Sequence, residues 1–269
     1  MNRQAKVLSA GIQTLCQDIG RSGYARDGVS TAGVYDRIAA ARANTLVGND
    51  PTDAVLECLL GGLTLQFNCD VLVAAHDDVC AQPISAGECF TVPKRSDPLR
   101  TYVAVTGGWR LPAVLGSRST DTLSGLGPLA ISTDDVLPIG IDLQHEPAAV
   151  PPLPNRSLDT LHALWSPALA QSDIGSFTQS PWTVLPESDR SGMRLRRPGA
   201  PCPPRIDGRS QPMERGSIEW LGNGDVVVIG PDGPVTGGYP IIGAVVDDDL
   251  DLLGQLRPGA TVSLASATT

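Results

Sequence analysis

Short apolar segments interrupted by polar positions dominate the first half of the chain. Between residues 63 and 67, Leu63, Leu65 and Phe67 alternate with Thr64 and Gln66, the period of a half-buried strand. Apolar runs rich in β-branched residues at 71–75 and 101–106 predict two more strands. Residues 6–10 and 12–17 are further strand candidates. The first half is therefore expected to be mainly β.

One segment of this half has a helical pattern. Residues 36–47 place apolar side chains near one face, and Asp36 is positioned to cap the N-terminus. Gly48 follows as the expected C-terminal cap. The apolar residues that share this face are Ile38, Ala39, Ala43, Leu46 and Val47.

The second half mixes strands and helices in the same way. Residues 183–185, 225–229 and 261–264 are predicted strands, and 158–164 is predicted as a short helix. A second helix is predicted at 248–256, closed by Arg257-Pro258-Gly259.

A proline-rich stretch at 145–154 separates the halves, and it cannot form a helix or a central strand because proline lacks a backbone donor. We place a domain boundary there, giving domains 1–145 and 146–269.

Two features indicate an internal duplication. The string V-T-G-G-W at 105–109 matches V-T-G-G-Y at 235–239. A turn led by glycine or aspartate also enters a short apolar strand four times, at Gly87, Asp134, Gly224 and Gly259. Many short strands, frequent turns and few helices favour two related β-barrels over a parallel α/β sheet.

Composition narrows the class of protein. The 269 residues carry a formal net charge of −9, which argues against a nucleic-acid partner because no basic face is available for phosphates. No window approaches the roughly 20 apolar residues of a membrane span, and no signal peptide is visible. A cytoplasmic protein with no membrane and no nucleic-acid partner is expected.

The cysteines and histidines do not predict a metal site. None of the six cysteines forms a C-x-x-C pair, so buried or half-buried free thiols are expected. The three histidines are far apart in sequence. A metal site or a Ser-His-Asp triad built from them is the minor alternative.

The sharpest local motif is D-I-G-R-S-G-Y at 18–24, which continues into a glycine-rich stretch ending at Asp36 and Arg37. Such dense glycines mark backbone with positive φ or a close approach to another chain or a ligand. Asp18, Arg21, Asp36 and Arg37 are candidates for ion pairs that hold this loop; an ordered structural loop is the alternative.

These residues resemble the opening of the carboxyltransferase A/B family, which includes the C subunit of bacterial 5-oxoprolinase and part of urea carboxylase. The resemblance continues in order through A-N-x-L-V-G-N at 43–49, L-E-x-x-x-G-G-x-x-L at 56–65, V-T-G-G at 105–108, V-L-G-S-R-S-T at 114–120 and D-V-L-P at 135–138.

The second half resembles the family through S-D-R-x-G-x-R-L at 188–195 and T-G-G-Y-P at 236–240. It departs from the family at four positions that usually carry Gln or Lys, and it is shorter. Those positions are Glu219, Asp225, Gly233 and Ile241. Loss of amide and ammonium donors at these positions calls catalytic competence into question.

The resemblance implies a mainly β fold of two tandem cyclophilin-like β-barrels with a few short helices, the second barrel shortened. It also implies that the chain is one component of a hydrolase and is active only together with an A subunit and a cyclophilin-like B subunit. The complex is expected to open 5-oxoproline, a small amide, to glutamate using ATP and water. No G-x-x-x-x-G-K-[ST] phosphate loop is present, so ATP is expected at the level of the complex.

Binding of substrate or nucleotide is predicted at four groups of residues. Hydroxyls and a guanidinium in one turn suit a carboxylate or phosphate, and glycine-rich segments offer backbone N–H groups. The candidates are Gly107, Gly108, Ser117, Arg118, Ser119, Thr120, Asp189, Arg190, Thr236, Gly237, Gly238 and Tyr239. Structural turns, and an Asp189–Arg190 ion pair bracing the second barrel, are the alternatives.

Two other functions stay open. The chain is alternatively a component of a biotin-dependent urea or amide carboxyltransferase, with biotin carried by another protein because no Met-Lys acceptor pair occurs here. It is otherwise a non-catalytic binding protein that regulates a partner barrel protein.

Overall fold

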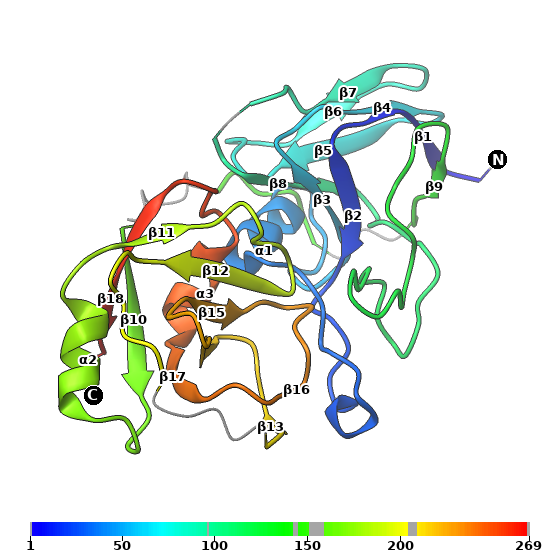
Figure 1. Ribbon diagram of the computed structural model, residues 1–269. Helices are drawn as coiled ribbons and strands as arrows, with labels where there is room; N and C mark the ends of the chain where they lie inside the picture. The colour runs from blue at the N-terminus through cyan, green and yellow to red at the C-terminus, as the bar shows by residue number, and fades with distance from the viewer. Residues whose placement is uncertain (1, 96, 142–144, 151–158, 204–208, 268–269) are drawn as a thin grey trace. The chain divides into compact units, whose positions relative to one another are not determined.

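The computed structural model describes residues 2–95, 97–141, 145–150, 159–203 and 209–267, and they form a mainly β protein with three short α-helices (Figure 1). The chain forms two compact units. Unit 1 comprises Met1–Arg21, Ala32–Asp121 and Gly125–Asn155, and unit 2 comprises Ser22–Thr31, Thr122–Ser124 and Arg156–Thr269. The division predicted at 145/146 stays a prediction.

Unit 1 holds two antiparallel sheets. The first has the order β7-β4-β1-β9 and the second the order β2-β3-β8-β5-β6. Their bounds are β1 Gln4–Ala10, β2 Gln13–Gln17, β3 Val55–Leu59, β4 Leu63–Phe67, β5 Val71–Ala75, β6 Gln82–Ile84, β7 Cys89–Thr91, β8 Arg100–Val105 and β9 Val136–Pro138.

One apolar core joins the two sheets of unit 1. Val7 and Leu65 enter it from the first sheet, and Leu56, Val73 and Val103 enter it from the second. The opposite face of the second sheet packs under helix α1, Arg37–Leu46. Because this sheet is covered on both faces, β8 is buried along its whole length.

Helix α1 confirms the predicted helix and its cap. The Asp36 carboxylate accepts a hydrogen bond from Ala39 N at 3.0 Å, and Gly48 adopts φ 77° just beyond the last turn. The expectation for Ile38 is wrong, since it is 45% exposed. Arg42 is buried in the same helix, where its guanidinium donates to the carbonyls of His76 and Asp78 at 2.7 Å.

Unit 2 is a closed barrel with the strand order β10-β17-β14-β15-β12-β11-β18. The strands are β10 Thr160–Trp165, β11 Trp182–Val184, β12 Gly192–Arg196, β14 Ser217–Trp220, β15 Val226–Ile229, β17 Ile241–Val245 and β18 Thr261–Ser266. A separate ribbon pairs β13, Gln211–Pro212, with β16, Thr236–Gly237. Helix α2, Gln171–Thr178, lies beside β18, and α3 spans Asp247–Leu253 (Figure 1).

The helix predicted at 158–164 is wrong over its described part, because residues 160–165 form β10. Leu161 and Ala163 are buried while His162 and Leu164 are exposed, which is the period of a strand. Pairing of β10 with β17 on one side and β18 on the other closes the barrel.

The turn signals are confirmed at every predicted position. Gly87, Asp134, Gly224 and Gly259 all adopt positive φ, and they precede β7, β9, β15 and β18. Helix α3 also confirms the helix predicted at 248–256, but it ends at Leu253, before the predicted end. The described part of the proline-rich stretch, residues 145–150, contains no helix or strand.

Candidate functional site

The S-R-S-T turn of unit 1 is organised around Asp18. Its carboxylate accepts hydrogen bonds from Ser117 Oγ, Ser119 Oγ and the Arg118 backbone N–H, each at 2.6 Å. Both serines are fully buried. Their hydroxyls, which the sequence suggested as ligand donors, are therefore already engaged by a residue about 100 positions earlier in the chain.

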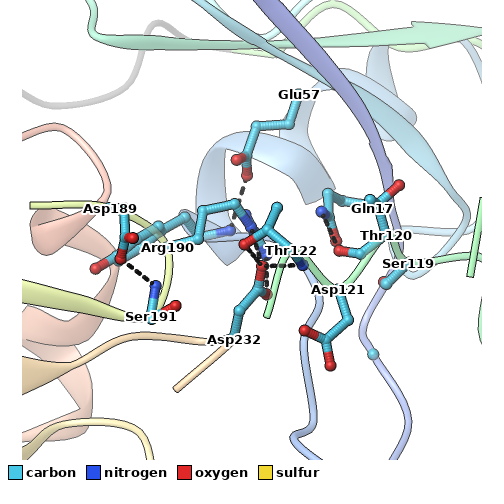
Figure 2. Close-up of polar contacts among 12 residues, drawn as sticks. Gln17, Glu57, Ser119, Thr120, Asp121, Thr122, Asp189, Arg190, Ser191 and Asp232 are labelled. Carbon is cyan, nitrogen blue, oxygen red and sulfur yellow. Dashed lines mark hydrogen bonds and ion pairs between the residues drawn. The ribbon is translucent and has the colours of Figure 1, made fainter. Parts of the chain in front are cut away.

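Several buried polar atoms beside this turn lack a hydrogen-bond partner in the part of the chain that the structure describes. Gln17 Oε1, Thr120 Oγ1, Arg118 Nε and Arg21 Nη1 are buried and make no hydrogen bond with the described residues. Gln17 Nε2 donates to the Thr120 carbonyl at 2.9 Å (Figure 2). Arg21 donates to the Ser119 carbonyl, and its Nη1 lies 4.0 Å from Asp121 Oδ2. Buried polar atoms are normally satisfied, so this turn has the capacity to bind water or a small polar group.

In unit 2, Arg190 and Thr122 converge on Asp232 (Figure 2). Arg190 Nε and Nη2 reach the two Asp232 oxygens at 2.9 and 2.8 Å, a bidentate pair that is almost fully buried. Thr122 donates to Asp232 Oδ2 from its N–H at 2.9 Å and from its hydroxyl at 2.7 Å. Asp189 accepts from Ser191 N and Gly192 N instead. These contacts support a bracing role within unit 2.

The two T-G-G segments differ in conformation, so they do not form equivalent turns. Gly107 and Gly108 have φ values of 89° and 74°, and their N–H groups donate to Asn49 Oδ1 and the Val105 carbonyl. Gly237 instead lies in β16, opposite Gln211, and is not among the positive-φ glycines. The expected free N–H groups at residues 107 and 108 are therefore occupied.

The ribbon that contains Thr236 and Gly237 covers Glu219 of β14. A Cβ atom at Gly237 would lie 2.5 Å from Glu219 Oε1 and 2.8 Å from the Met213 sulfur, so glycine is what allows this close approach. Glu219 is 8% exposed. Burial raises the pKa of its carboxyl, an effect that the charge of Arg194 partly offsets.

Glu57 is a second buried carboxylate, in unit 1, and it is fully engaged. It accepts from Tyr102 Oη at 3.0 Å and from Tyr35 N at 3.1 Å, and Arg100 Nε lies 3.3 Å away. Burial and the neighbouring Glu57 charge raise the pKa of Tyr102. Since Tyr102 Oη also accepts from Asp36 N, this network supports the start of helix α1.

Cysteines and histidines of the described residues do not build a further site. All six cysteines are free thiols, but the expectation that they are buried or half-buried is wrong for Cys80, Cys89 and Cys202, which are exposed. Burial raises the pKa of Cys16 to about 12. Within the described ranges, no group of three or more His, Cys, Asp or Glu side chains is arranged to hold a metal ion. No described helix has both the length and the apolar character needed to cross a membrane.

The sequence indicated the turn at 117–120 as a binding candidate but did not single out Gln17, whose Oε1 atom lacks a hydrogen-bond partner among the described residues. It flagged Glu219 only as a departure from the family. In both cases the available signal was a polar residue that follows a buried apolar residue of a strand.

Known proteins resemble this chain in both sequence and fold. The family model "Carboxyltransferase domain, subdomain A and B" matches residues 27–266. The C subunit of 5-oxoprolinase from Escherichia coli is 32% identical over 96% of this chain and 89% of its own length. Crystal structures of TTHA0988 and of the K. lactis urea amidolyase, both 27% identical, superpose on 98% of this chain with TM-scores of 0.89 and 0.90. The chain spans 56% and 19% of those two proteins.

Proposed function

Because the chain belongs to the carboxyltransferase family of subdomains A and B, we propose that it is the C subunit of an ATP-dependent 5-oxoprolinase. The observation that carries this proposal is the match to the C subunit of E. coli 5-oxoprolinase over nearly the full length of both chains, 96% and 89%. The letter in that name indicates further subunits, and this chain acts with the A and B subunits.

The chemistry explains the need for ATP. The lactam of 5-oxoproline is an unstrained amide and reacts slowly with water. Transfer of the γ-phosphoryl group to the lactam oxygen releases ADP and makes the ring carbon a better electrophile. Water then adds to that carbon, and the C–N bond breaks as the nitrogen gains a proton, which gives an acyl phosphate of glutamate. A second water hydrolyses this acyl phosphate to glutamate and phosphate. A protein contributes by orienting the lactam and by stabilising the charge that develops on oxygen.

Three of the four departures from the family sequence have structural roles. Asp225 accepts hydrogen bonds from Arg196 and Asn223. A Cβ at Gly233 would lie 2.3 Å from the Ile229 side chain, and Ile241 packs against the apolar cluster that contains Ile229. The fourth, Glu219, makes no hydrogen bond or ion pair within the described part of the chain. Loss of the usual Gln and Lys residues therefore leaves the barrel intact.

A carboxyltransferase component for urea or a similar amide is the second candidate. The specific observation that favours it is the TM-score of 0.90 to the K. lactis urea amidolyase. Since no Met-Lys pair occurs in the chain, biotin would arrive on another protein. A non-catalytic regulatory protein is the third candidate, favoured by the altered Gln and Lys positions.

Reconstitution tests the proposal. The purified chain is mixed with its A and B partners, and glutamate release from 5-oxoproline is followed with and without ATP. Release that needs both ATP and this chain is the expected result. A stable complex that releases no glutamate would overturn the oxoprolinase role, and activity on urea with a biotinylated carrier would establish the second candidate instead.

A further inference from the structure

We propose that the outer face of the unit 2 barrel, beneath the β13–β16 ribbon, binds a small molecule through Glu219 and Arg194. The ligand class is a compound that carries both an amide or lactam N–H and a carboxylate. This inference rests on the proposed function in one respect: 5-oxoproline is the member of that class chosen as the probe.

Strand register puts the two side chains in one row. Arg194 pairs with Val227, and Val227 pairs with Glu219 on its other side. The neighbours of these residues along the strands, including Leu195, Val228 and Ile218, are buried inside the barrel. Since side chains alternate across a strand, Arg194, Val227 and Glu219 share the outer face. Their backbones are two strand spacings apart, roughly 10 Å from Arg194 to Glu219.

The surroundings of Glu219 are those of a built site. Met213 and Gly237 lie against its carboxylate, and Met213 belongs to an apolar cluster with Leu221 and Val227. More than nine-tenths of Glu219 is buried, yet its carboxylate has no hydrogen-bond or ion-pair partner within the described residues. Although most of the Glu219 residue is covered, its carboxylate oxygens keep some contact with solvent. A ligand N–H donor can therefore reach them and would offset the cost of their partial burial.

Arg194 supplies the complementary charge. Its side chain is exposed and makes no hydrogen bond or ion pair among the residues that the structure describes. Its charge acts on Glu219, although no ion pair within 4.0 Å joins the two. A ligand between them satisfies both groups, because its N–H donates to Glu219 and its carboxylate accepts from the Arg194 guanidinium.

Binding to the purified chain is measured by NMR titration with three ligands. 5-Oxoproline carries both features, its lactone analogue lacks the N–H, and 2-pyrrolidinone lacks the carboxylate. Only 5-oxoproline is expected to bind well, and each analogue is expected to bind about 10-fold or more weakly. Equal binding of the lactone analogue would overturn the role of Glu219.

Variants separate binding from folding. Glu219→Met and Arg194→Met are each expected to weaken 5-oxoproline binding about 10-fold or more, whereas Arg194→Lys retains part of it. Glu187→Met, which removes an exposed carboxylate on a turn, is the matched control and leaves binding unchanged. If Glu219→Met fails to fold, Gly237→Ala serves instead, since its new Cβ would displace the Glu219 carboxylate. Unchanged affinity in folded Glu219→Met or Gly237→Ala would refute the site.

The reconstituted complex distinguishes the failure of this site from the failure of the proposed function. ATP-dependent glutamate release with an unchanged KM in Glu219→Met would leave the function standing and overturn the site. Absence of release in the wild type, combined with binding of 5-oxoproline that Glu219→Met weakens, would refute the function and leave the site standing.

Discussion

Glu219 should make the stability of unit 2 depend on pH. Burial raises the pKa of Glu219 above its ordinary 4.5, so the folded state holds this proton more tightly than the unfolded state does. Its contribution is therefore most favourable below pH 4.5 and is lost as pH rises through the folded pKa. Glu219→Gln should exceed wild type in unfolding free energy by about 1 kcal/mol at pH 8, with little difference at pH 4. Thermal denaturation at the two pH values measures this, and a pH-independent difference would contradict it.

The Arg190–Asp232 pair should be among the most sensitive positions of unit 2. Its side chains are 3% and 0% exposed, so Asp232→Ala leaves a buried guanidinium and two Thr122 donors without their carboxylate. A loss of about 3–5 kcal/mol in unfolding free energy is expected. Arg196→Ala is the control because Arg196 is 54% exposed, and its loss of stability should be much smaller. Similar losses in chemical denaturation would show that Asp232 is not a buried anchor.

His76 should make unit 1 sensitive to acid. Burial lowers the pKa of His76 from 6.5 to about 4, and its Nδ1 must stay unprotonated to accept from Tyr102 N at 3.2 Å. The folded state therefore loses stability as pH falls from 6.5 toward 4, by about 3 kcal/mol at most. His76→Asn keeps an acceptor but does not titrate. Urea denaturation across this pH range should show a smaller loss in the variant than in the wild type.

Residue-scale chemistry was the hardest part to predict from sequence. Ser117 and Ser119 were identified as hydroxyl donors, but their acceptor Asp18 lies near the start of the chain. The partner of Arg190 proved to be Asp232, not the adjacent Asp189. Local sequence shows which groups are available, whereas long-range folding decides which of them remain unpaired.

At the scale of elements, glycine positions differ sharply in what they tolerate. Gly107 and Gly116 both have positive φ, but a Cβ at Gly107 would lie 2.2 Å from the Gly140 carbonyl oxygen, whereas one at Gly116 meets nothing within 4 Å. Both Ala variants bear backbone strain of about 1 kcal/mol, and Gly107→Ala should lose about 2 kcal/mol more. Parallel denaturation of the two variants tests this, and equal losses would argue against a close contact.

Turn chemistry and alternation predicted most of the described strands of unit 1. The strand at 63–67 was placed at its observed bounds because its period is clear, and each glycine- or aspartate-led turn adopts positive φ. Thr160–Trp165 was mistaken for a helix because a short apolar run does not distinguish the two periods. Its strand character comes from pairing with β18, about 100 residues later in the chain.

For the whole molecule, the family resemblance and the mainly β fold were confirmed, and the closed barrel of unit 2 agrees with the expected architecture. Barrel closure could not be derived from local patterns, since β10 and β18 come from opposite ends of unit 2. The sequence shows Glu219 where the family usually has Gln. The lack of a partner for the Glu219 carboxylate among the described residues could not be predicted, because it depends on the ribbon that folds over this residue.

The location of the ATP site follows from the proposed function. The chain has no G-x-x-x-x-G-K-[ST] loop, and the proposal assigns ATP to the assembled complex. Mg-ATP should therefore leave the melting temperature of the isolated chain unchanged. It should stabilise the complex with the A and B partners by about 2.7 kcal/mol at a ligand concentration 100 times Kd. Differential scanning calorimetry with Mg-ADP as the comparison ligand measures both states. Stabilisation of the isolated chain by Mg-ATP would place a nucleotide site within this chain, and the unpartnered atoms around Thr120 would then be the first positions to mutate.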